Sequence, residues 1–247
     1  PCLFEHEFVP QITDLEALVD ENTVAILYNF PSNPTGATIN IEQRDALLAF
    51  AQKHDLWIIS DEVYDRIVFD GEHVSFVGTD SDRVVLINSF SKTFAMTGWR
   101  IGYIMSANLE AMKQFTKIQY YITACSNDAM QHAVLTAFDE ASDYPSIMAE
   151  EFKARCDLIV ARLNKMPGVQ CHKPKGAFYV FPKVEVPGMN SEEIALELLK
   201  GGVLCSPGSA FGASGEGHLR FAYTISRKDI ERGMEKTAAT LKALRGD

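Results

Sequence analysis

Three short apolar runs, each rich in β-branched residues and each ending in polar or turn-forming residues, constrain the fold of this chain most strongly. They are residues 23–29 (TVAILYN), 56–60 (LWIIS) and 84–88 (VVLIN). Residues 41–54, between the first two runs, have the apolar spacing of a helix. Alternation of short buried strands with longer amphipathic helices predicts an α/β protein with a mostly parallel sheet.

The remainder of the chain extends this pattern into a second, smaller domain. Residues 102–105 predict one more strand, residues 108–141 are mostly helical, and residues 145–166 predict a long amphipathic helix. Beyond it the pattern predicts strands at 176–182, 203–205 and 219–224 and helices at 191–200 and 228–244. We therefore expect a large domain over residues 1–150 and a small α+β domain over residues 151–247.

Charge and cysteine content argue against several classes of partner and site. The formal net charge is -10, so the field of the chain repels phosphate backbones and anionic lipids, and neither nucleic acid nor a membrane is expected as a partner. No apolar run approaches the roughly 18 residues that a membrane-spanning helix needs. Five cysteines without C-x-x-C spacing argue against a metal site or a disulfide framework and favour a cytoplasmic location.

The segment Asp61-Glu62-Val63-Tyr64 follows the second predicted strand. Ligands of open parallel sheets bind beyond the carboxyl ends of the strands, so this segment borders a candidate site. A carboxylate in such a buried position needs a cation or a strong donor as its partner, which makes Asp61 a candidate binding residue. An aspartate at a strand end also serves as a helix cap or turn former, and that alternative stays open. Glu62 is given no role.

The segment Ser89-Phe90-Ser91-Lys92 follows the third predicted strand. A lysine that loses part of its solvation can act as an amine nucleophile, although an isolated lysine in such a motif is more often a solvated surface charge. Ser89, Ser91 and Arg100 supply two hydroxyls and a guanidinium, which are groups suited to a phosphate dianion. The gap from Lys92 to Arg100 is predicted to be a loop, because the glycines at 98 and 102 are poor helix formers.

Two more candidates are weak when each is taken alone. The sequence Asn33-Pro34-Thr35-Gly36 is typical of a turn. Arg220 lies in a predicted strand, where an isolated arginine is usually a solvated edge charge. It follows the glycine-containing loop PGSAFG of residues 207–212.

Taken together, these segments resemble a known family. The string SFSKTFAMTGWRIG of residues 89–102 resembles, position by position, the pyridoxal-phosphate (PLP) attachment signature of class I aminotransferases. Residues 28–36 (YNFPSNPTG) resemble the family's N-P-x-N-P-T-G motif, from which they depart by one inserted position. The loop 207–212 and Arg220 resemble its P-G-x-x-F-G loop and the arginine after it. The chain is identified as a member of the aspartate aminotransferase family of fold type I.

The resemblance implies a role for each candidate residue. Lys92 would be the catalytic lysine that is joined covalently to PLP, and Asp61 would face the ring nitrogen of the cofactor. Tyr64 and Asn33 would bind its phenolic oxygen, and Asn33 would also lie beside the substrate. Ser89, Ser91 and Arg100 would bind its phosphate, and Arg220 would bind the α-carboxylate of the substrate.

The resemblance also implies an activity and an assembly. The expected function is transfer of an amino group between an amino acid and a 2-oxo acid by a ping-pong mechanism, in a homodimer. Aspartate is mildly favoured, because residues 89–103 look most like the bacterial and archaeal aspartate branch. Two alternatives share the motifs, namely a PLP-dependent β- or γ-lyase or synthase on the same fold, and a non-catalytic aminotransferase-like regulatory domain.

The beginning of the chain departs from the family pattern. The first residue is Pro1, and the sequence runs directly into an ordinary domain interior. The intact subunits of the family have an additional N-terminal portion with a phosphate-binding cup and an aromatic residue that stacks on the cofactor. We therefore expect an N-terminally incomplete large domain, which would bind the cofactor weakly and turn over slowly unaided.

Overall fold

A computed structural model describes residues 2–246, and its contacts divide them into two compact units. The sheet unit consists of Gln11–Pro31 and Thr38–Ala149. The C-terminal unit consists of the chain from Glu150 onward together with the segments up to Pro10 and Ser32–Ala37. The two short N-terminal segments were not anticipated in this unit. The division into functional domains at 150/151 stays a prediction, and its outer bounds, Pro1 and Asp247, lie outside the described residues.

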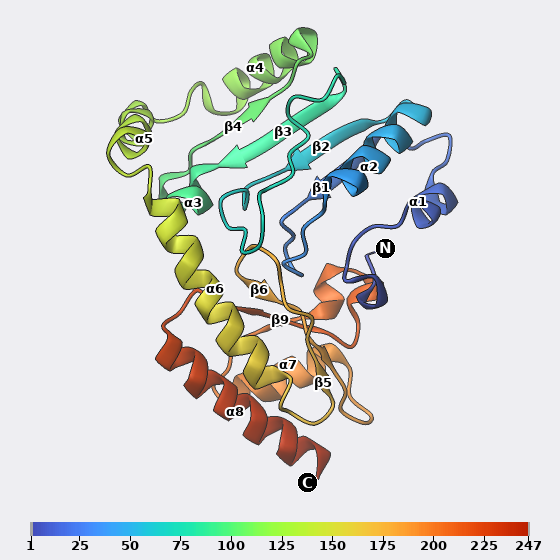
Figure 1. The fold of residues 1–247 in the computed structure, drawn as a ribbon, viewed down its shortest axis with the longest axis vertical. Coiled ribbons are helices and arrows are strands. Elements are labelled where there is room, and N and C mark those ends of the chain that lie inside the picture. The colour runs from blue at the N-terminus through green and yellow to red at the C-terminus, as the bar shows by residue number, and fades with distance from the viewer. Residues whose placement is uncertain (1, 247) are drawn as a thin grey trace. The chain divides into compact units, whose positions relative to one another are not determined.

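A four-stranded sheet forms the centre of the sheet unit (Figure 1). Its order is β1-β2-β3-β4, in which β1, β2 and β3 are parallel and β4 is antiparallel to β3. The strands are β1 (Ala25–Asn29), β2 (Trp57–Asp61), β3 (Val84–Ser89) and β4 (Gly102–Met105). The mostly parallel α/β sheet expected from the sequence is confirmed.

The register of the parallel strands brings their carboxyl ends to one edge. Asn29 at the end of β1 lies opposite Asp61 at the end of β2, and Asp61 lies opposite Ile87 of β3. The side-chain amide of Asn29 also donates to the Asp61 carbonyl at 3.2 Å. The segments that follow β2 and β3 therefore leave the sheet side by side at the same edge.

Helices complete the sheet unit, and their ends follow local capping rules. They are α1 (Ile12–Leu18), α2 (Ile41–Lys53), α3 (Phe90–Thr93), α4 (Leu109–Thr123), α5 (Asp128–Glu140) and the 3-10 helix η2 (Thr97–Trp99). Helix α2 begins with a capping box, in which Asn40 accepts from the Gln43 amide and the Gln43 side chain accepts from the Asn40 amide. A small core beneath α3 and α5 consists of Phe90, Phe94, Ile101, Val134 and Ala137.

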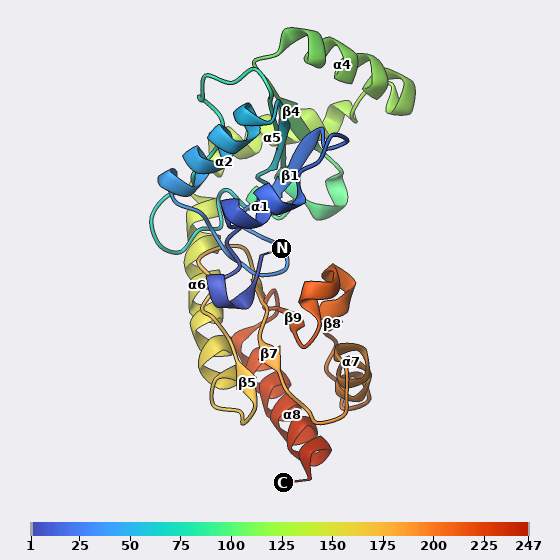
Figure 2. The same cartoon turned by 90° about the vertical axis from the view of Figure 1, so that its right-hand side faces the viewer.

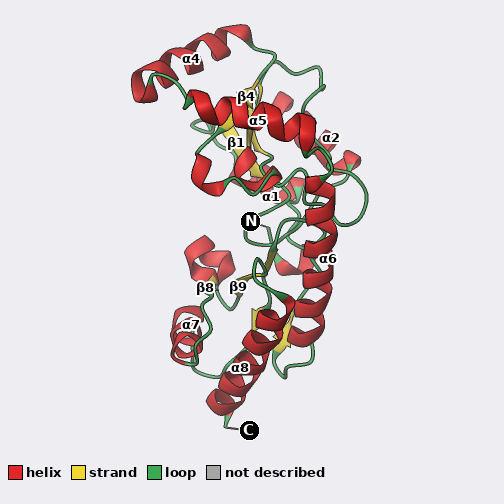
Figure 3. Ribbon diagram, turned by 90° about the vertical axis from the view of Figure 1, so that its left-hand side faces the viewer, coloured by secondary structure: helices red, strands yellow, loops and turns green. Residues whose placement is uncertain are grey.

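The C-terminal unit combines three long helices with short antiparallel strands, as predicted for an α+β domain (Figure 2). The helices are α6 (Tyr144–Leu163), which crosses the division at Glu150, α7 (Ser191–Lys200) and α8 (Arg227–Arg245), drawn in red in Figure 3. One strand pair is β5 (Val169–Gln170) with β7 (Lys183–Val184), and the other sheet is β6 (Tyr179–Val180), β9 (Leu219–Ala222) and β8 (Ser206–Pro207). Three 3-10 helices are η1 (Phe4–His6), η3 (Gly208–Phe211) and η4 (Ala213–Gly215).

Two local predictions were wrong. No strand covers residues 203–205, because the Val203 amide donates to the Leu198 carbonyl at 2.8 Å and closes the end of α7; the strand begins later, at Ser206. The segment after Lys92 is not a plain loop, since Lys92 lies in the helical turn α3 and η2 precedes Arg100. Ser89 caps that turn by accepting a hydrogen bond from the Ser91 amide.

Candidate functional site

Six of the sequence candidates gather at the carboxyl edge of the sheet unit. Asp61 ends β2, Ser89 ends β3, and Lys92 lies in the turn that follows β3. The charges of Asp61 and Lys92 each shift the pKa of the other group, so the two lie within electrostatic range. The six are Asp61, Tyr64, Ser89, Ser91, Lys92 and Arg100. Parallel pairing of β2 with β3 is the feature that brings them together.

Lys92 is a half-buried amine beside a buried tyrosine. Its Nζ lies 5.7 Å from the ring centroid of Tyr64, a residue that is only 4% exposed. Burial lowers the pKa of Lys92, the charge of Arg100 lowers it further, and the charge of Asp61 opposes both. A lowered pKa increases the neutral fraction of the amine, and neutral amine is the form that acts as a nucleophile or a base.

Asp61 is a half-buried carboxyl group whose pKa is shifted in the direction opposite to that of Lys92. Burial raises its pKa, the negative charge of Glu62 adds to this, and hydrogen bonds from the Val63 amide and Asn29 act in the other direction. The Val63 amide lies 3.3 Å from Asp61 Oδ1. A half-buried carboxyl group in this state gains from a cationic donor, because such a partner stabilises the ionised form. The protonated nitrogen of a pyridine ring is a donor of that kind.

Ser89 and Ser91 form a pair of hydroxyls next to Lys92, and Arg100 is close enough for its charge to affect that lysine. The Ser89 hydroxyl lies 2.9 Å from the Ser91 hydroxyl and 3.1 Å from the Ile101 carbonyl oxygen. Arg100 is exposed, has a left-handed backbone with φ of 53°, and donates from Nη1 to the Thr97 carbonyl at 2.9 Å. Two hydroxyls and an exposed guanidinium match the donor set that a phosphate dianion requires.

Asn33 and Arg220 meet in the C-terminal unit, although 187 residues separate them in the sequence. Arg220 Nη1 donates to Asn33 Oδ1 at 2.8 Å, and Nη2 donates to Ser206 Oγ at 3.0 Å. The guanidinium carbon lies 4.7 Å from the Tyr179 ring centroid and 4.9 Å from that of Phe211. These contacts fix the plane of the guanidinium, as bidentate binding of a carboxylate requires.

Sequence reasoning missed three of the four residues that hold Arg220, namely Tyr179, Ser206 and Phe211. Phe211 is the aromatic residue of the loop 207–212 that was noted only as a motif. Tyr179 and Ser206 lie in β6 and β8, which are strands of only two residues each, and nothing in their local sequence indicates a contact with Arg220. Pairing of β8 with β9 sets Ser206 opposite Arg220.

Gly208 lets the loop before β9 close. A Cβ atom at Gly208 would lie 1.9 Å from the Gly215 carbonyl oxygen and 2.6 Å from that of His218, and both are backbone atoms. Gly208→Ala is therefore expected to lower the free energy of unfolding by about 1–3 kcal/mol, as overpacking does. Gly233→Ala in α8 is the matched control, because nothing lies within 4 Å of its added Cβ. It should raise stability by about 0.5–1 kcal/mol, and urea unfolding measures both.

The lowered pKa of Lys92 predicts that this amine is acetylated at lower pH than an ordinary lysine. Competitive acetylation at a series of pH values, followed by mass spectrometry, should give Lys92 a titration midpoint below the ordinary lysine value of 10.5. Arg100→Gln should move the midpoint upward, because it removes a positive charge that disfavours the ammonium form. Asp61→Asn should move it further down. A midpoint of 10.5 or higher in the unmodified protein contradicts the prediction.

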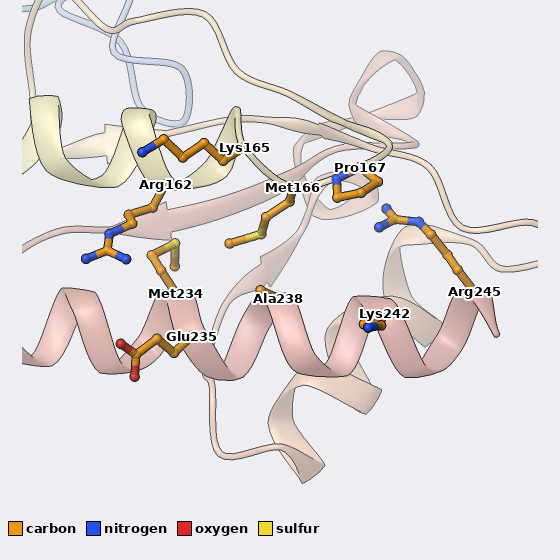
Figure 4. A pocket seen from close by; sticks show the side chains of 9 residues that line it. All are labelled: Arg162, Lys165, Met166, Pro167, Met234, Glu235, Ala238, Lys242 and Arg245. Atoms are coloured by element: carbon orange, nitrogen blue, oxygen red, sulfur yellow. The ribbon is translucent and has the colours of Figure 1, made fainter. Parts of the chain in front are cut away.

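The C-terminal unit also contains a groove of about 410 Å³ between the end of α6 and α8 (Figure 4). Met166, Met234 and Ala238 contribute apolar surface to it, and Lys165 and Lys242 lie among its basic residues. None of the candidate site residues in the described chain lines this groove.

Two other kinds of feature are absent from residues 2–246. No group of three or more His, Cys, Asp or Glu side chains there could hold a metal ion. None of the helices in that range has the length and apolar character that a bilayer-spanning helix needs.

Comparison with known proteins identifies the family. Residues 1–236 match the family described as aminotransferase class I and II. The chain belongs to this family. An aspartate aminotransferase of Pyrococcus horikoshii is 36% identical over 251 residues, which cover all of this chain and 63% of that protein. Aromatic-amino-acid aminotransferase 2 of Thermococcus litoralis is 36% identical over 248 residues, with coverage of 98% and 63%.

A solved structure supports the same assignment for the fold. The aromatic aminotransferase of Pyrococcus horikoshii superposes with a TM-score of 0.94 at 36% identity, over 98% of this chain and 66% of that one. The chain thus spans 63% of the length of the two relatives named above. Class I and II aminotransferases are PLP-dependent. The amine, carboxylate and phosphate-type donor set at the carboxyl edge of the sheet unit fits that cofactor.

Proposed function

We propose that this protein is a PLP-dependent aminotransferase that moves an amino group between an amino acid and a 2-oxo acid by a ping-pong mechanism. The observation that carries the proposal is the convergence of Lys92 with Asp61 and Tyr64 at the carboxyl edge of parallel strands β2 and β3, where Nζ of Lys92 lies 5.7 Å from the Tyr64 ring centroid. A partly desolvated amine within electrostatic range of a carboxylate and a guanidinium is suited to a cofactor with an aldehyde, a basic ring nitrogen and a phosphate.

In the proposal, six residues hold the cofactor in addition to the attachment lysine. When bound, PLP supplies an electron-accepting ring. Asp61 keeps the ring nitrogen protonated, and the partial burial of this carboxylate strengthens the interaction. Tyr64 and Asn33 donate hydrogen bonds to the phenolic oxygen. Ser89, Ser91 and Arg100 bind the phosphate, and Lys92 forms the covalent link.

Lys92 and Arg220 act on the substrate. Nζ of Lys92 is a general base that removes the proton from the substrate Cα, a role helped by the lowered pKa of this amine. Arg220 binds the α-carboxylate, and its contacts with Asn33 and Ser206 orient the guanidinium for that task. The first product leaves before the second substrate binds, because both use the same carboxylate-binding arginine.

Aspartate is proposed as the favoured amino acid, on the resemblance of residues 89–103 to the aspartate branch. The named relatives include both an aspartate and an aromatic-amino-acid aminotransferase, so aromatic substrates belong in the same assay. A cytoplasmic location is proposed from the buried thiols of Cys156 and Cys171, which form no disulfide.

A homodimer is proposed from the surface of α4. None of the residues of this helix is buried in the described chain. Tyr121 is 78% exposed and Ile122 is 70% exposed, and Ile118 and Tyr120 of the same helix are exposed as well. Exposed apolar side chains in such number are typical of a surface that another copy covers.

The spectrum of the protein mixed with PLP tests the proposal. A visible absorbance band that disappears when aspartate is added, with glutamate formed after addition of 2-oxoglutarate, is the expected result. Ammonia or a cleaved product without glutamate would indicate a lyase. A band that no amino acid changes would indicate a binding domain without turnover.

A further inference from the structure

Glu62, directly after Asp61, is a buried carboxylate surrounded by donors. It is 2% exposed. Its Oε1 accepts from the Ser60 hydroxyl at 2.8 Å and from the Phe76 amide at 3.2 Å. Its Oε2 lies 2.6 Å from Nε2 of His73, a side chain that is 14% exposed. The cofactor site proposed above does not use Glu62 or His73.

These donors account for a buried negative charge. Burial raises the pKa of Glu62, but hydrogen bonds from His73, Ser75 and Ser60 together with the charge of His73 hold it below its ordinary value. An ionised carboxylate in this position is stable only while its donors stay in place, because an unpaired buried charge costs several kcal/mol. Glu62 therefore ties together the segments that carry those donors.

The segments are the end of β2 and the connection from β2 to β3. Phe76, whose amide binds Glu62, is 1% exposed, and its ring packs edge-on against Tyr28 with 5.2 Å between the centroids. The carbonyl of Ser75 accepts from Arg44 Nη1 at 3.2 Å. The middle of the connection is thus held by β1 and α2, and Glu62 links it to the end of β2 and its next residues, where Asp61 and Tyr64 lie.

Glu62 follows the last residue of β2 and continues its pairing, since the Glu62 amide donates to the Ile87 carbonyl at 2.9 Å, so strand alternation directs Asp61 and Glu62 to different partners. Successive side chains of a strand point to opposite faces. Ser60, which is fully buried, binds Glu62, whereas Asp61 interacts electrostatically with Lys92. A shift of Glu62 would move the backbone that holds Asp61.

We propose that Glu62 and His73 are positioning residues that hold Asp61 and Tyr64 in place for the cofactor. This inference rests on the proposed function. It predicts that loss of the Glu62–His73 pair loosens residues 61–64 even without cofactor, weakens PLP binding and lowers turnover.

Glu62→Gln and His73→Gln test the proposal, together with the double variant. The control is Glu16→Gln, which removes a glutamate with a histidine and a lysine partner, His54 and Lys53, elsewhere in the sheet unit. Three quantities are measured: amide hydrogen exchange of residues 61–64 without cofactor, the Kd of PLP by absorbance titration, and kcat for aspartate. His73→Gln serves if Glu62→Gln does not fold, because His73 lies closer to the surface.

We expect each single variant to speed exchange at residues 61–64 and to weaken PLP binding and kcat by about 10- to 100-fold, as loss of supporting residues does at other sites. In the double variant the two glutamines can bind each other, so its loss should be smaller than the product of the single losses. Glu16→Gln should change none of the three.

Unchanged exchange at residues 61–64 in both single variants would overturn the inference. A Kd within twofold of the unmodified protein, or an equal loss in Glu16→Gln, would do the same. If the unmodified protein forms no PLP band, the proposed function fails instead, and the exchange measurement still decides whether Glu62 and His73 order this segment.

Discussion

Lys92→Ala is expected to remove the visible absorbance band formed with PLP and to lower turnover by at least about 10³-fold. The covalent link requires an amine at this position, and loss of a general base alone lowers rates by about 10²- to 10⁴-fold. Lys92 is half-buried and caps no helix, so the folded state should survive the change. Absorbance titration and a coupled assay for glutamate formation measure the two effects.

Lys53→Ala is the matched control for this change. Lys53 is exposed on α2 and pairs with Glu16 at 2.8 Å, in the same unit as Lys92. Its loss should leave both band and turnover unchanged, since exposed ion pairs contribute little. A borohydride-reducible adduct that persists in Lys92→Ala would show that another lysine carries the cofactor.

Arg220→Lys is expected to lower kcat/KM for aspartate by roughly 10- to 150-fold, because a charged hydrogen bond contributes about 1.5–3 kcal/mol. The positive charge remains in the variant, but the planar pair of donors and the ring contacts with Tyr179 and Phe211 are lost. The bonds to Asn33 and Ser206 fix the plane of the arginine guanidinium, which an ammonium group cannot reproduce.

A substrate without a carboxylate separates this role from a general loss of structure. A primary amine that lacks the α-carboxylate should react equally slowly with the unmodified protein and with Arg220→Lys. Arg162→Lys is the control, since Arg162 pairs with Glu231 at 3.0 Å in the same unit and should be replaceable. An Arg220→Lys variant with unchanged kcat/KM for aspartate would contradict the assignment.

The strands that carry the site could be predicted from sequence, because each buried strand is a short apolar run with a polar end. Residues 56–60 and 84–88 coincide with β2 and β3 to within one residue at each end. The lysine, the carboxylate and the serines follow these strands directly, so their gathering at one edge follows from parallel pairing.

Contacts between distant segments could not be predicted in the same way. Nothing local in the sequence indicates that Asn33 binds Arg220, since the bond depends on the packing of a turn against β9. Glu62 was given no role because its partners, His73 and the Phe76 amide, are 11 and 14 residues away in a segment without periodicity. The short strand β8 was misplaced for a similar reason, since its position depends on how α7 ends.

The pairing of β2 with its neighbours makes the order of Asp61 and Glu62 critical. Side chains of a strand alternate between faces, so a single-residue deletion in β2 before Ser60 that kept the pairing would set Glu62 at the position of Asp61, facing the amine. The aspartate would take the place of Ser60, and the serine would turn to the opposite face. The place of Glu62 would pass to Val63, whose side chain cannot accept a hydrogen bond from His73 or from the Phe76 amide.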